Sequence, residues 1–498
     1  MNVNPITRLD YPDPDVIRVE DTYYMVSTTM HFMPGCEILQ SFDLVHWEHV
    51  TYVYETLDHT DAQQLKSGQN IYGQGMWAAS LRYHEGRFYI CFVANDTRKT
   101  YLYTSEKIDG PWKKQLIEGF YHDGSLLFDE DGRNYIVYGN DEIWITELNE
   151  DLTAPKKDGL HRLLVSDHKN PELGYEGSHI QKINGYYYIF LVHSLRDRWM
   201  RTEACFYSDS LEGEFTGGDV LCDDRGYCGQ GVAQGGIVDT PDGKWYAMLF
   251  QDSGAVGRIP ILVPVTWKDH FPFFGQNGHV PEEIEVHSTR PGYIYQPLVG
   301  SDDFCNGLLP RWQFNHDPDP RYYHLDALQG TYTITTREVC TELTQAVNTL
   351  TQRMSYPSCA AEVTVDASAL KEGDVAGLCA LQGCYAAVGI TKHHGKYEVL
   401  MLDKKEDGIL DMTEGTVVES HQMDFRLEAD FCNMKDEARC YYRVNKGDWL
   451  PIGTVHKLYF KLDHFTGCRF GLFCYAAEKT GGSACFRDFK YYDVDEIS

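Results

Sequence analysis

The 498-residue sequence lacks several features that would place it in common protein classes. It has no run of Lys or Arg, and 44 basic against 74 acidic residues give a formal net charge of −30 at pH 7. Such a charge disfavours nucleic acid or an anionic membrane surface as a partner. No stretch of 18 apolar residues occurs, so no membrane-spanning helix is predicted. We therefore expect neither a nucleic-acid nor a membrane partner, and the charge says nothing about oligomeric state.

The common spacings of zinc and redox sites are also missing. The 15 cysteines include no Cys-x-x-Cys pair, and the 20 histidines show no His-Glu-x-x-His motif. Most cysteines lie in apolar, strand-like segments, as Cys91 and Cys474 do, which is typical of reduced and buried thiols. The segment MNVNPITRL lacks the charged and apolar regions of a secretory signal. These features favour a cytoplasmic location.

Long segments with helical periodicity are absent, and one short unit recurs five times instead. The unit is an aliphatic strand, a turn with Gly or Asp, and a strand that opens with aromatic residues. The copies are VIRVEDTYYMVS, LRYHEGRFYICF, LLFDEDGRNYIVYG, IQKINGYYYIFL and IVDTPDGKWYAMLF. Their tips lie at Asp21, Gly86, Gly132, Gly185 and Gly243, which are 65, 46, 53 and 58 residues apart. These lengths suit four-stranded blades, so the sequence predicts a five-bladed β-propeller.

The second half of the chain has a different organisation. A segment punctuated by Pro and Gly, RPGYIYQPLVGSDDF, precedes alternating segments such as GTYTITT and KYEVLMLD, which are typical of a β-sandwich. We expect an all-β chain with a propeller at residues 1–297 and a sandwich at residues 298–498.

Five residues occupy matching positions in the repeats, eight or nine residues before each tip. They are Asp13, Trp77, Asp123, Glu176 and Gln234. The innermost strands of a propeller surround its axis, so these side chains are expected to converge on one cavity. Three of the five are acidic, and like charges held together are costly unless function requires them.

Converging carboxyl groups suit the hydrolysis of glycosides. One carboxyl protonates the leaving oxygen, and a second activates water or attacks the sugar. A third carboxylate nearby would raise the pKa of the acid by like-charge repulsion. A Ca²⁺ site built from the same oxygens is the competing interpretation, and a purely structural turn is the ordinary role of any single Asp.

Five motifs resemble the successive blade motifs of family 43 of the glycoside hydrolases. They are YPDPD, GMWAASL, YHDGSLLFD, YEGSHI and GRIPILVPVTW, and they extend in order from residue 1 to about residue 290. The second half, with NTLTQR and SDDFCNGLLPRWQFNHDPDPRYYHL, resembles the concanavalin-like domain of the xylosidase and arabinofuranosidase branches. In such relatives a loop of the sandwich can reach the mouth of the active site, and Trp312–His316 and the stretch KTGGSACFRDF are the candidates for it here. A purely structural partner and a carbohydrate-binding domain are the alternatives for the sandwich. The resemblance implies a five-bladed propeller that acts on arabinose- and xylose-containing plant polysaccharides by an inverting single displacement.

The resemblance also implies residue roles. Asp13 would be the general base that activates water, Glu176 the general acid, and Asp123 the residue that tunes and orients the acid. Arg258 would lie beside the sugar and could pair with Asp123. The other implied substrate-binding residues are Trp77, Phe32, Met30 and Gln234.

Gln234 stands where several family members carry a histidine that binds a metal or water on the axis. No metal and no cofactor is therefore expected to be required, and an axial Ca²⁺ is disfavoured without being excluded. In the stretch DYPDPD (residues 10–15), Asp15 is expected to be a strand-start residue on another face, and Asp10 a loop residue.

The sequence thus predicts an exo-acting enzyme that releases a terminal pentose from hemicellulose-derived oligosaccharides. The combination of GRIP, DRWMRTEACF and this type of sandwich favours an α-L-arabinofuranosidase, and a β-D-xylosidase or a dual enzyme is the alternative. A non-catalytic carbohydrate-binding propeller is a more distant alternative, which would need the aromatic residues and Arg258 but no acid and base.

Overall fold

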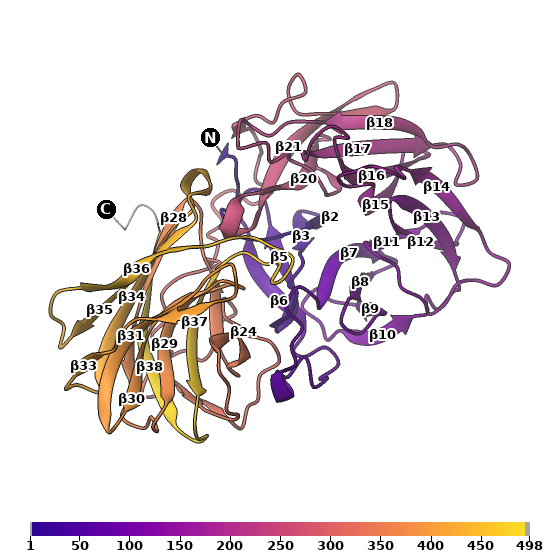
Figure 1. Cartoon of the computed structure of the whole chain (residues 1–498). Coiled ribbons are helices and arrows are strands. Elements are labelled where there is room, and N and C mark those ends of the chain that lie inside the picture. Colours follow the sequence, from indigo (N-terminus) through magenta and orange to yellow (C-terminus); the bar gives the residue numbers. More distant parts are fainter. Residues whose placement is uncertain (1, 494–498) are drawn as a thin grey trace.

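A computed structural model of the chain describes residues 2–493. Figure 1 shows two β-rich bodies side by side, a propeller drawn in indigo to magenta and a sandwich drawn in orange and yellow. The predicted all-β fold with five blades and a sandwich is confirmed. The helical elements of the described residues are four single 3₁₀ turns: η1 (Lys66–Gly68), η2 (Gly254–Val256), η3 (Leu343–Gln345) and η4 (Cys432–Met434). None of these described helices is long and apolar enough to cross a membrane.

Each blade is a four-stranded antiparallel sheet whose strands are neighbours in the order of the chain. The first blade holds β2 (Asp15–Val19), β3 (Thr22–Val26), β5 (Gly35–Ser41) and β6 (Glu48–Tyr54), and the second holds β7 (Met76–His84), β8 (Arg87–Ala94), β9 (Lys99–Ser105) and β10 (Lys113–Ile117). The third holds β11 (Ser125–Phe128), β12 (Asn134–Asn140), β13 (Glu142–Leu148) and β14 (His161–Ser166). The fourth holds β15 (Glu176–Ile183), β16 (Tyr186–Ser194), β17 (Arg201–Ser208) and β18 (Thr216–Leu221). The fifth holds β19 (Ile237–Asp239), β20 (Trp245–Asp252), β21 (Arg258–Lys268) and β22 (Phe271–Phe274).

The inner hairpins turn where the repeat predicts. In the fourth blade Ile183 pairs with Tyr186, so Asn184 and Gly185 form a two-residue turn with φ values of 50° and 85°. Two positive φ values are the signature of the type I′ turn, which matches the twist of the flanking strands and favours Asn-Gly. The local sequence therefore fixes the register of this inner hairpin.

The ring closes without a blade that is shared between the two ends of the propeller. Strand β1 (Asn2–Val3) pairs with β23 (Glu283–Ile284) outside the blades. The buried Asn4 side chain donates to the carbonyl of Leu262 at 2.9 Å and accepts from its N–H at 3.0 Å. The Asn4 side chain thus bonds both main-chain groups of Leu262, as a paired strand would, and joins the start of the chain to β21.

A buried ion pair lies on the inner strands. Asp15 is 1% exposed, and its carboxylate accepts from Arg82 at 2.8 Å, from the N–H of Leu81 at 2.7 Å and from His179 at 3.0 Å. Arg82 also donates to the Ser125 hydroxyl at 2.7 Å, so four blades meet at one charged network. Asp15 is the first residue of β2, as predicted, and its carboxylate has a structural role where the inner strands of four blades meet, in a network separate from that of Asp13.

Beyond this network, the inner strands line an open cavity of about 420 Å³, with Arg18, Arg82 and Trp245 among its lining residues. It lies towards the hairpin tips, at the end of the axis opposite to the converging carboxyl groups.

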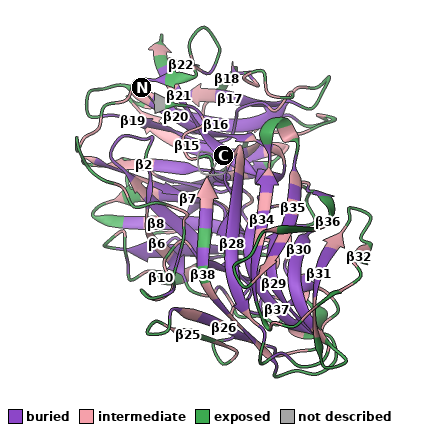
Figure 2. Ribbon diagram, turned by 90° about the vertical axis from the view of Figure 1, so that its left-hand side faces the viewer, coloured by how far each residue is buried: buried purple, intermediate pink, exposed green. Residues whose placement is uncertain are grey.

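The sandwich consists of two antiparallel sheets with a large apolar core between them. The first sheet holds β32 (Leu410–Met412), β31 (Lys396–Lys404), β30 (Ala386–His393), β29 (Asp374–Leu381), β37 (Arg469–Ala476), β27 (Leu350–Arg353) and β24 (Gln313–Asn315), with β33 (Thr416–Val418) paired to β31. The second holds β25 (Tyr323–Asp326), β26 (Thr331–Thr335), β38 (Ser483–Asp493), β28 (Ser358–Asp366), β34 (Gln422–Asp430), β35 (Glu437–Val444) and β36 (Leu450–Lys457). Figure 2 shows how continuously the central strands of the two sheets are buried.

The two bodies share strands and core. Strand β4 (Phe32–Met33), which lies between β3 and β5 in sequence, leaves the first blade and pairs with β24 at the edge of the sandwich sheet. Ala255, Val256 and Ile259 of the propeller are part of the core that fills the sandwich. The interface therefore has the packing of a protein interior, which favours one fixed arrangement of the two bodies.

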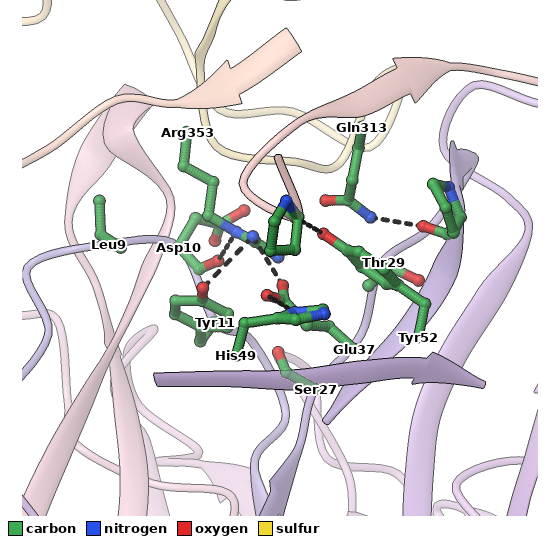
Figure 3. A network of polar contacts seen from close by, with 12 residues as sticks. Leu9, Asp10, Tyr11, Ser27, Thr29, Glu37, His49, Tyr52, Gln313 and Arg353 are labelled. Carbon is green, nitrogen blue, oxygen red and sulfur yellow. Dashed lines mark hydrogen bonds and ion pairs between the residues drawn. The ribbon is translucent and has the colours of Figure 1, made fainter. Parts of the chain in front are cut away.

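Arg353 of β27 enters the first blade, as Figure 3 shows. It donates to Glu37 at 2.8 Å and to the main-chain carbonyl of Asp10 at 2.9 Å, and its guanidinium lies 4.1 Å from the centre of the Tyr11 ring. His49 binds the other oxygen of Glu37 at 3.0 Å. A buried cation of the sandwich thus holds the segment that leads to Asp13.

We expect Arg82→Met to lower the free energy of unfolding by about 3 kcal/mol, because it leaves the buried Asp15 carboxylate without its cation. Arg133→Met is the matched control, since Arg133 forms an ion pair with Asp131 at a side chain that is 44% exposed, and it should change stability by less than about 0.5 kcal/mol. Urea unfolding followed by circular dichroism measures both, and equal losses would contradict the axial role.

Candidate active site

One residue near the start of each inner hairpin has a positive φ. These residues are Asp13 (52°), Ala78 (36°), Asp123 (48°), Gly177 (67°) and Gln234 (63°). Backbone strain of this kind costs about 1–3 kcal/mol per non-glycine residue and gathers at functional sites. Trp77 and Glu176 directly precede two of these positions, where β7 and β15 shift register. The strained positions therefore form a ring around the axis at the end of the blades where the carboxyl groups lie.

Asp13 is fixed through both of its carboxylate oxygens. Arg258 donates to Oδ1 at 3.0 Å, and the Thr28 hydroxyl donates to Oδ2 at 2.6 Å. Thr28 in turn accepts from the N–H of Ala78 at 2.8 Å, which ties the second blade to the first. Asp13 is 6% exposed, so this carboxylate has one orientation and little contact with bulk water.

Arg258, the first residue of β21, binds two carboxylates. Besides Asp13 it binds Asp252 at 3.3 Å, and Asp252 also accepts from Arg201 at 2.9 Å. Although burial opposes ionisation, the two arginines hold the pKa of Asp252 below its ordinary value. The predicted pairing of Arg258 with Asp123 is wrong, because the guanidinium faces Asp13 on the other side of the site.

Asp123 and Glu176 lie together on the third and fourth blades. Asp123 accepts from the N–H of Gly177 at 2.9 Å, and Glu176 accepts from the Asn140 side chain at 2.9 Å. His122 Nε2 lies 3.5 Å from Asp123 Oδ2 and 3.5 Å from Glu176 Oε2. Glu176 is the most accessible of the three carboxyl groups, with a side chain that is 19% exposed against 8% for Asp13 and 6% for Asp123.

The electrostatics of this cluster differ from the prediction. Burial, together with the charges of Glu176 and Asp13, raises the pKa of Asp123 to about 6. Burial acts against ionisation of Glu176 too, but the hydrogen bond and the charge of His122 lower its pKa. Asp123 above all, and then Glu176, raise the pKa of His122 to about 9. The sequence predicts that Asp123 raises the pKa of Glu176. The pKa is lowered instead, because the cationic His122, which the repeat register does not reveal, lies beside both carboxyl groups.

The same three residues form the group among residues 2–493 that could hold a metal ion. His122, Asp123 and Glu176 each offer one ligand atom, and these atoms lie within 4.8 Å of one another. A cation there would compete with the protonated form of His122 for the two carboxylates.

A loop of the sandwich reaches the propeller at the site. The β36–β37 loop (residues 458–468) places the Phe465 ring 5.3 Å from the Trp77 ring and 4.5 Å from the Arg258 guanidinium. Phe460 lies 5.7 Å from the same guanidinium. The sandwich therefore contributes to the site, through a loop that the sequence did not single out.

The two segments that were candidates for this contact lie elsewhere. Trp312 packs in the core of the sandwich, and His316 is buried against His31 at the interface. Most of the stretch KTGGSACFRDF belongs to β38, which pairs with β26 and β28 in the second sheet of the sandwich.

The remaining predicted contacts divide into two groups. Phe32 is wholly buried in β4 with the Arg469 guanidinium 3.5 Å from its ring, so its prediction as a sugar-stacking residue is wrong. Met30 is 2% exposed and pairs through its backbone with Met76, beside Trp77. Gln234 lies close to Gly177, where a Cβ atom would come within 2.7 Å of its side chain. Met30 and Gln234 thus border the site, whereas Phe32 is a residue of the domain interface.

Several residues of the site carried little signal in the sequence. His122 directly precedes Asp123 in HDGS, and the HD pair was the one available indication of it. Thr28, Asp252 and Phe465 lie outside the aligned hairpin positions, and their contacts with Asp13, Arg258 and Trp77 join segments far apart in sequence.

Comparisons with known proteins agree with this architecture. The model of "Glycosyl hydrolases family 43" matches residues 3–272, and that of "Beta xylosidase C-terminal Concanavalin A-like domain" matches residues 301–492. A protein of Formosa agariphila named beta-xylosidase is 26% identical over 99% of this chain and 89% of its own length. One of Butyrivibrio fibrisolvens named xylosidase/arabinosidase is 24% identical over 99% of both.

Among solved structures, one described as a bifunctional GH43-CE protein of Bacteroides eggerthii superposes with a TM-score of 0.92. It is 42% identical and covers 99% of this chain, whereas this chain spans 64% of its length. The likeness therefore extends over both the propeller and the sandwich.

We expect His122→Gln to remove a pH-dependent part of the stability. Because the folded-state pKa of His122, about 9, exceeds its ordinary value of 6.5, its contribution is complete below about pH 6.5 and is lost as the pH rises through 9. The difference in urea midpoint between wild type and variant should therefore be largest near pH 6 and smallest near pH 10. A difference that grows with pH would contradict a cationic His122.

Proposed function

The chain belongs to family 43 of the glycosyl hydrolases, and from that premise we propose that it is an exo-acting, inverting glycosidase that releases a terminal pentose from oligosaccharides. The observation that carries the proposal is the presence of two carboxyl groups in separate networks at one site. Asp13 is held by Arg258 and Thr28, and Glu176 is held beside His122 and Asn140. An acid and a base that do not share a proton are what a single displacement requires.

Asp13 is proposed as the general base. Its two fixed hydrogen bonds set the plane of the carboxylate and leave a lone pair on each oxygen to accept a proton from water. Asp13 and Glu176 have separate hydrogen-bond partners, and the mechanism proposed here requires room for one water molecule between Asp13 and the sugar.

Glu176 is proposed as the general acid, and Asp123 as the residue that orients it and tunes the proton. Asn140 donates to Oε2, so Oε1 remains for the proton that is passed to the leaving oxygen. With a pKa of about 9, His122 carries a proton at neutral pH next to both carboxyl groups. His122, Asp123 and Glu176 together hold the proton that Glu176 donates to the leaving group. Solvent supplies a new proton after each turnover.

Arg258, Trp77, Met30 and Gln234 are proposed to bind the sugar. The low exposure of Asp13 and Asp123, and the contact of Phe465 with Trp77, support a site that admits the end of a chain rather than its middle. Stacking of a sugar ring on Trp77 and donation from Arg258 to hydroxyl groups are the interactions these side chains offer.

α-L-Arabinofuranose is the proposed terminal sugar, on the strength of the sequence motifs GRIP and DRWMRTEACF. β-D-Xylose is the second candidate, and the names beta-xylosidase and xylosidase/arabinosidase of two relatives favour it. A dual enzyme would accept both.

An axial Ca²⁺ is not proposed as a requirement. The axial carboxylate, Asp15, is already bound by Arg82, His179 and a main-chain N–H. A guanidinium fixed at this place disfavours a second cation beside it.

We expect the wild-type chain to hydrolyse nitrophenyl α-L-arabinofuranoside or β-D-xyloside, assayed side by side together with the matching oligosaccharides. Asp13→Ala should lower kcat by about 10³-fold on all of them, because the water loses its base. Glu176→Ala should cost a similar factor on oligosaccharides, whose leaving groups need a proton, and much less on nitrophenyl glycosides.

Full activity of Glu176→Ala on an oligosaccharide would rule out its role as the acid. Absence of wild-type turnover on every arabinoside and xyloside, with binding retained, would instead support a carbohydrate-binding propeller.

We expect the first-formed sugar to have the inverted anomeric configuration, because water attacks the face opposite to the leaving group in a single displacement. Proton NMR recorded before mutarotation distinguishes the two anomers. A retained configuration would exclude the role given to Asp13.

A further inference from the structure

Asp10 links three parts of the molecule although it lies in a loop. Its carboxylate accepts from the N–H of Arg258 at 2.7 Å through Oδ1 and from the N–H of Gly467 at 2.8 Å through Oδ2. The first bond reaches the fifth blade, and the second reaches the β36–β37 loop of the sandwich. Asp10 is 5% exposed, so both bonds are made away from water, where an unpaired N–H is costly.

Two glycines allow this close approach. A Cβ atom on Gly257 would lie 2.3 Å from Asp10 Oδ1, and one on Gly467 would lie 2.7 Å from Asp10 Cβ and 2.2 Å from the carbonyl oxygen of Val256. Gly257 also has a φ of 104°, which other residues rarely adopt. The backbone on both sides of the carboxylate is thus shaped to contact it.

The two N–H groups belong to the parts of the chain that carry the Arg258 and Phe465 side chains. Arg258 binds the proposed base Asp13 through its guanidinium, and Gly467 follows Phe465 by two residues. The Phe465 ring in turn lies against that guanidinium and against Trp77. One carboxylate therefore fixes the backbone of both Arg258 and the loop that covers it.

The main chain of Asp10 is itself held by the sandwich. Arg353 donates to its carbonyl oxygen, as Figure 3 shows, while Tyr11 N–H donates to the carbonyl of Arg258 at 3.0 Å. The β36–β37 loop has a further anchor, since Cys468 N–H donates to the carbonyl of Ala255 at 2.8 Å. Among these contacts, the Asp10 carboxylate is the single group that binds both the propeller and the β36–β37 loop.

We propose that Asp10 is a positioning residue that locks the β36–β37 loop onto the backbone of Arg258 and thereby sets the affinity of the site for the terminal sugar. The effect on sugar binding rests on the proposed function, whereas the lock itself does not. Asp10 does not touch the reacting atoms, so it acts through Arg258 and Phe465.

Asp10→Asn tests the lock with little change of volume. An amide has one accepting oxygen, and its NH₂ group would face one of the two N–H donors, so one bond is lost. We expect kcat/KM on the pentoside that the wild type hydrolyses to fall by about 10-fold to 100-fold, mainly through a higher KM. An unchanged KM would overturn the proposal.

A double-mutant cycle identifies the route of the effect. If Asp10 acts by placing Phe465, then Asp10→Asn should change KM much less in a Phe465→Ala background than in the wild type. Fully additive effects of the two substitutions would overturn the link to the loop.

Asp302→Asn is the matched control. Asp302 is a buried carboxylate of the sandwich that also accepts two bonds, from Phe304 N–H at 2.8 Å and from the Trp312 indole at 2.8 Å. It should lower the stability and leave KM unchanged, so a general loss of stability cannot account for a raised KM that appears in Asp10→Asn alone. A raised KM in both variants would overturn the specific role.

Amide hydrogen exchange tests the lock without any substrate. Peptides from residues 458–468 should exchange at least about 10-fold faster in Asp10→Asn than in the wild type and in Asp302→Asn. Unchanged exchange would overturn the lock even in an active enzyme. Faster exchange in a chain that hydrolyses no pentoside would support the lock and reject the proposed function.

Discussion

The ion pair between Asp13 and Arg258 joins the first blade of the propeller to the last. A propeller closed without a shared blade must hold its two ends together by other means. At the outer edge the side chain of Asn4 does so, and at the site this ion pair does, supported by the Tyr11–Arg258 main-chain bond. Because the pair is buried, removing either charge would leave the other uncompensated, so closure of the ring and the orientation of the proposed base depend on the same contact.

The same constraint explains how a chain with a net charge of −30 tolerates several carboxylates around one axis. Each carboxylate has a cation beside it. Arg258 and Arg201 pair with Asp13 and Asp252, and His122 lies between Asp123 and Glu176. On the inner strands, Arg82 binds Asp15. Asp123 is deeply buried and faces two other negative charges, and its pKa is raised to about 6. A glycosidase needs one ionised carboxylate and one proton at the same site, and this arrangement supplies both.

The sequence allowed prediction of the features that recur in every blade. It did not allow prediction of contacts between different blades or between the propeller and the sandwich. The hairpin register identified Asp13, Asp123 and Glu176 because each lies at a fixed distance from a turn that its own blade encodes. Phe32 looked like a sugar-facing aromatic residue, yet β4 leaves the blade to pair with the sandwich, and no local pattern marks that exchange. His122, Phe465 and Arg353 act through contacts with segments tens to hundreds of residues away. Asp10 and Asp15 are both visible in the stretch DYPDPD, but their roles depend on partners elsewhere in the chain that its spacing does not indicate.

The sandwich has to be counted as part of the catalytic unit. Its core includes Val256 and Ile259, which flank Arg258 in the fifth blade, and Arg353 holds the segment that leads to Asp13. A shift of the sandwich relative to the propeller would therefore move Arg258, the base segment and the Phe465 loop together. Packed cores resist gradual deformation, so such a shift is costly and the site is held in one geometry. Phe465, which contacts Trp77 and Arg258, comes from the second domain, so the domain that holds the segment of the proposed base also supplies one side of the candidate site.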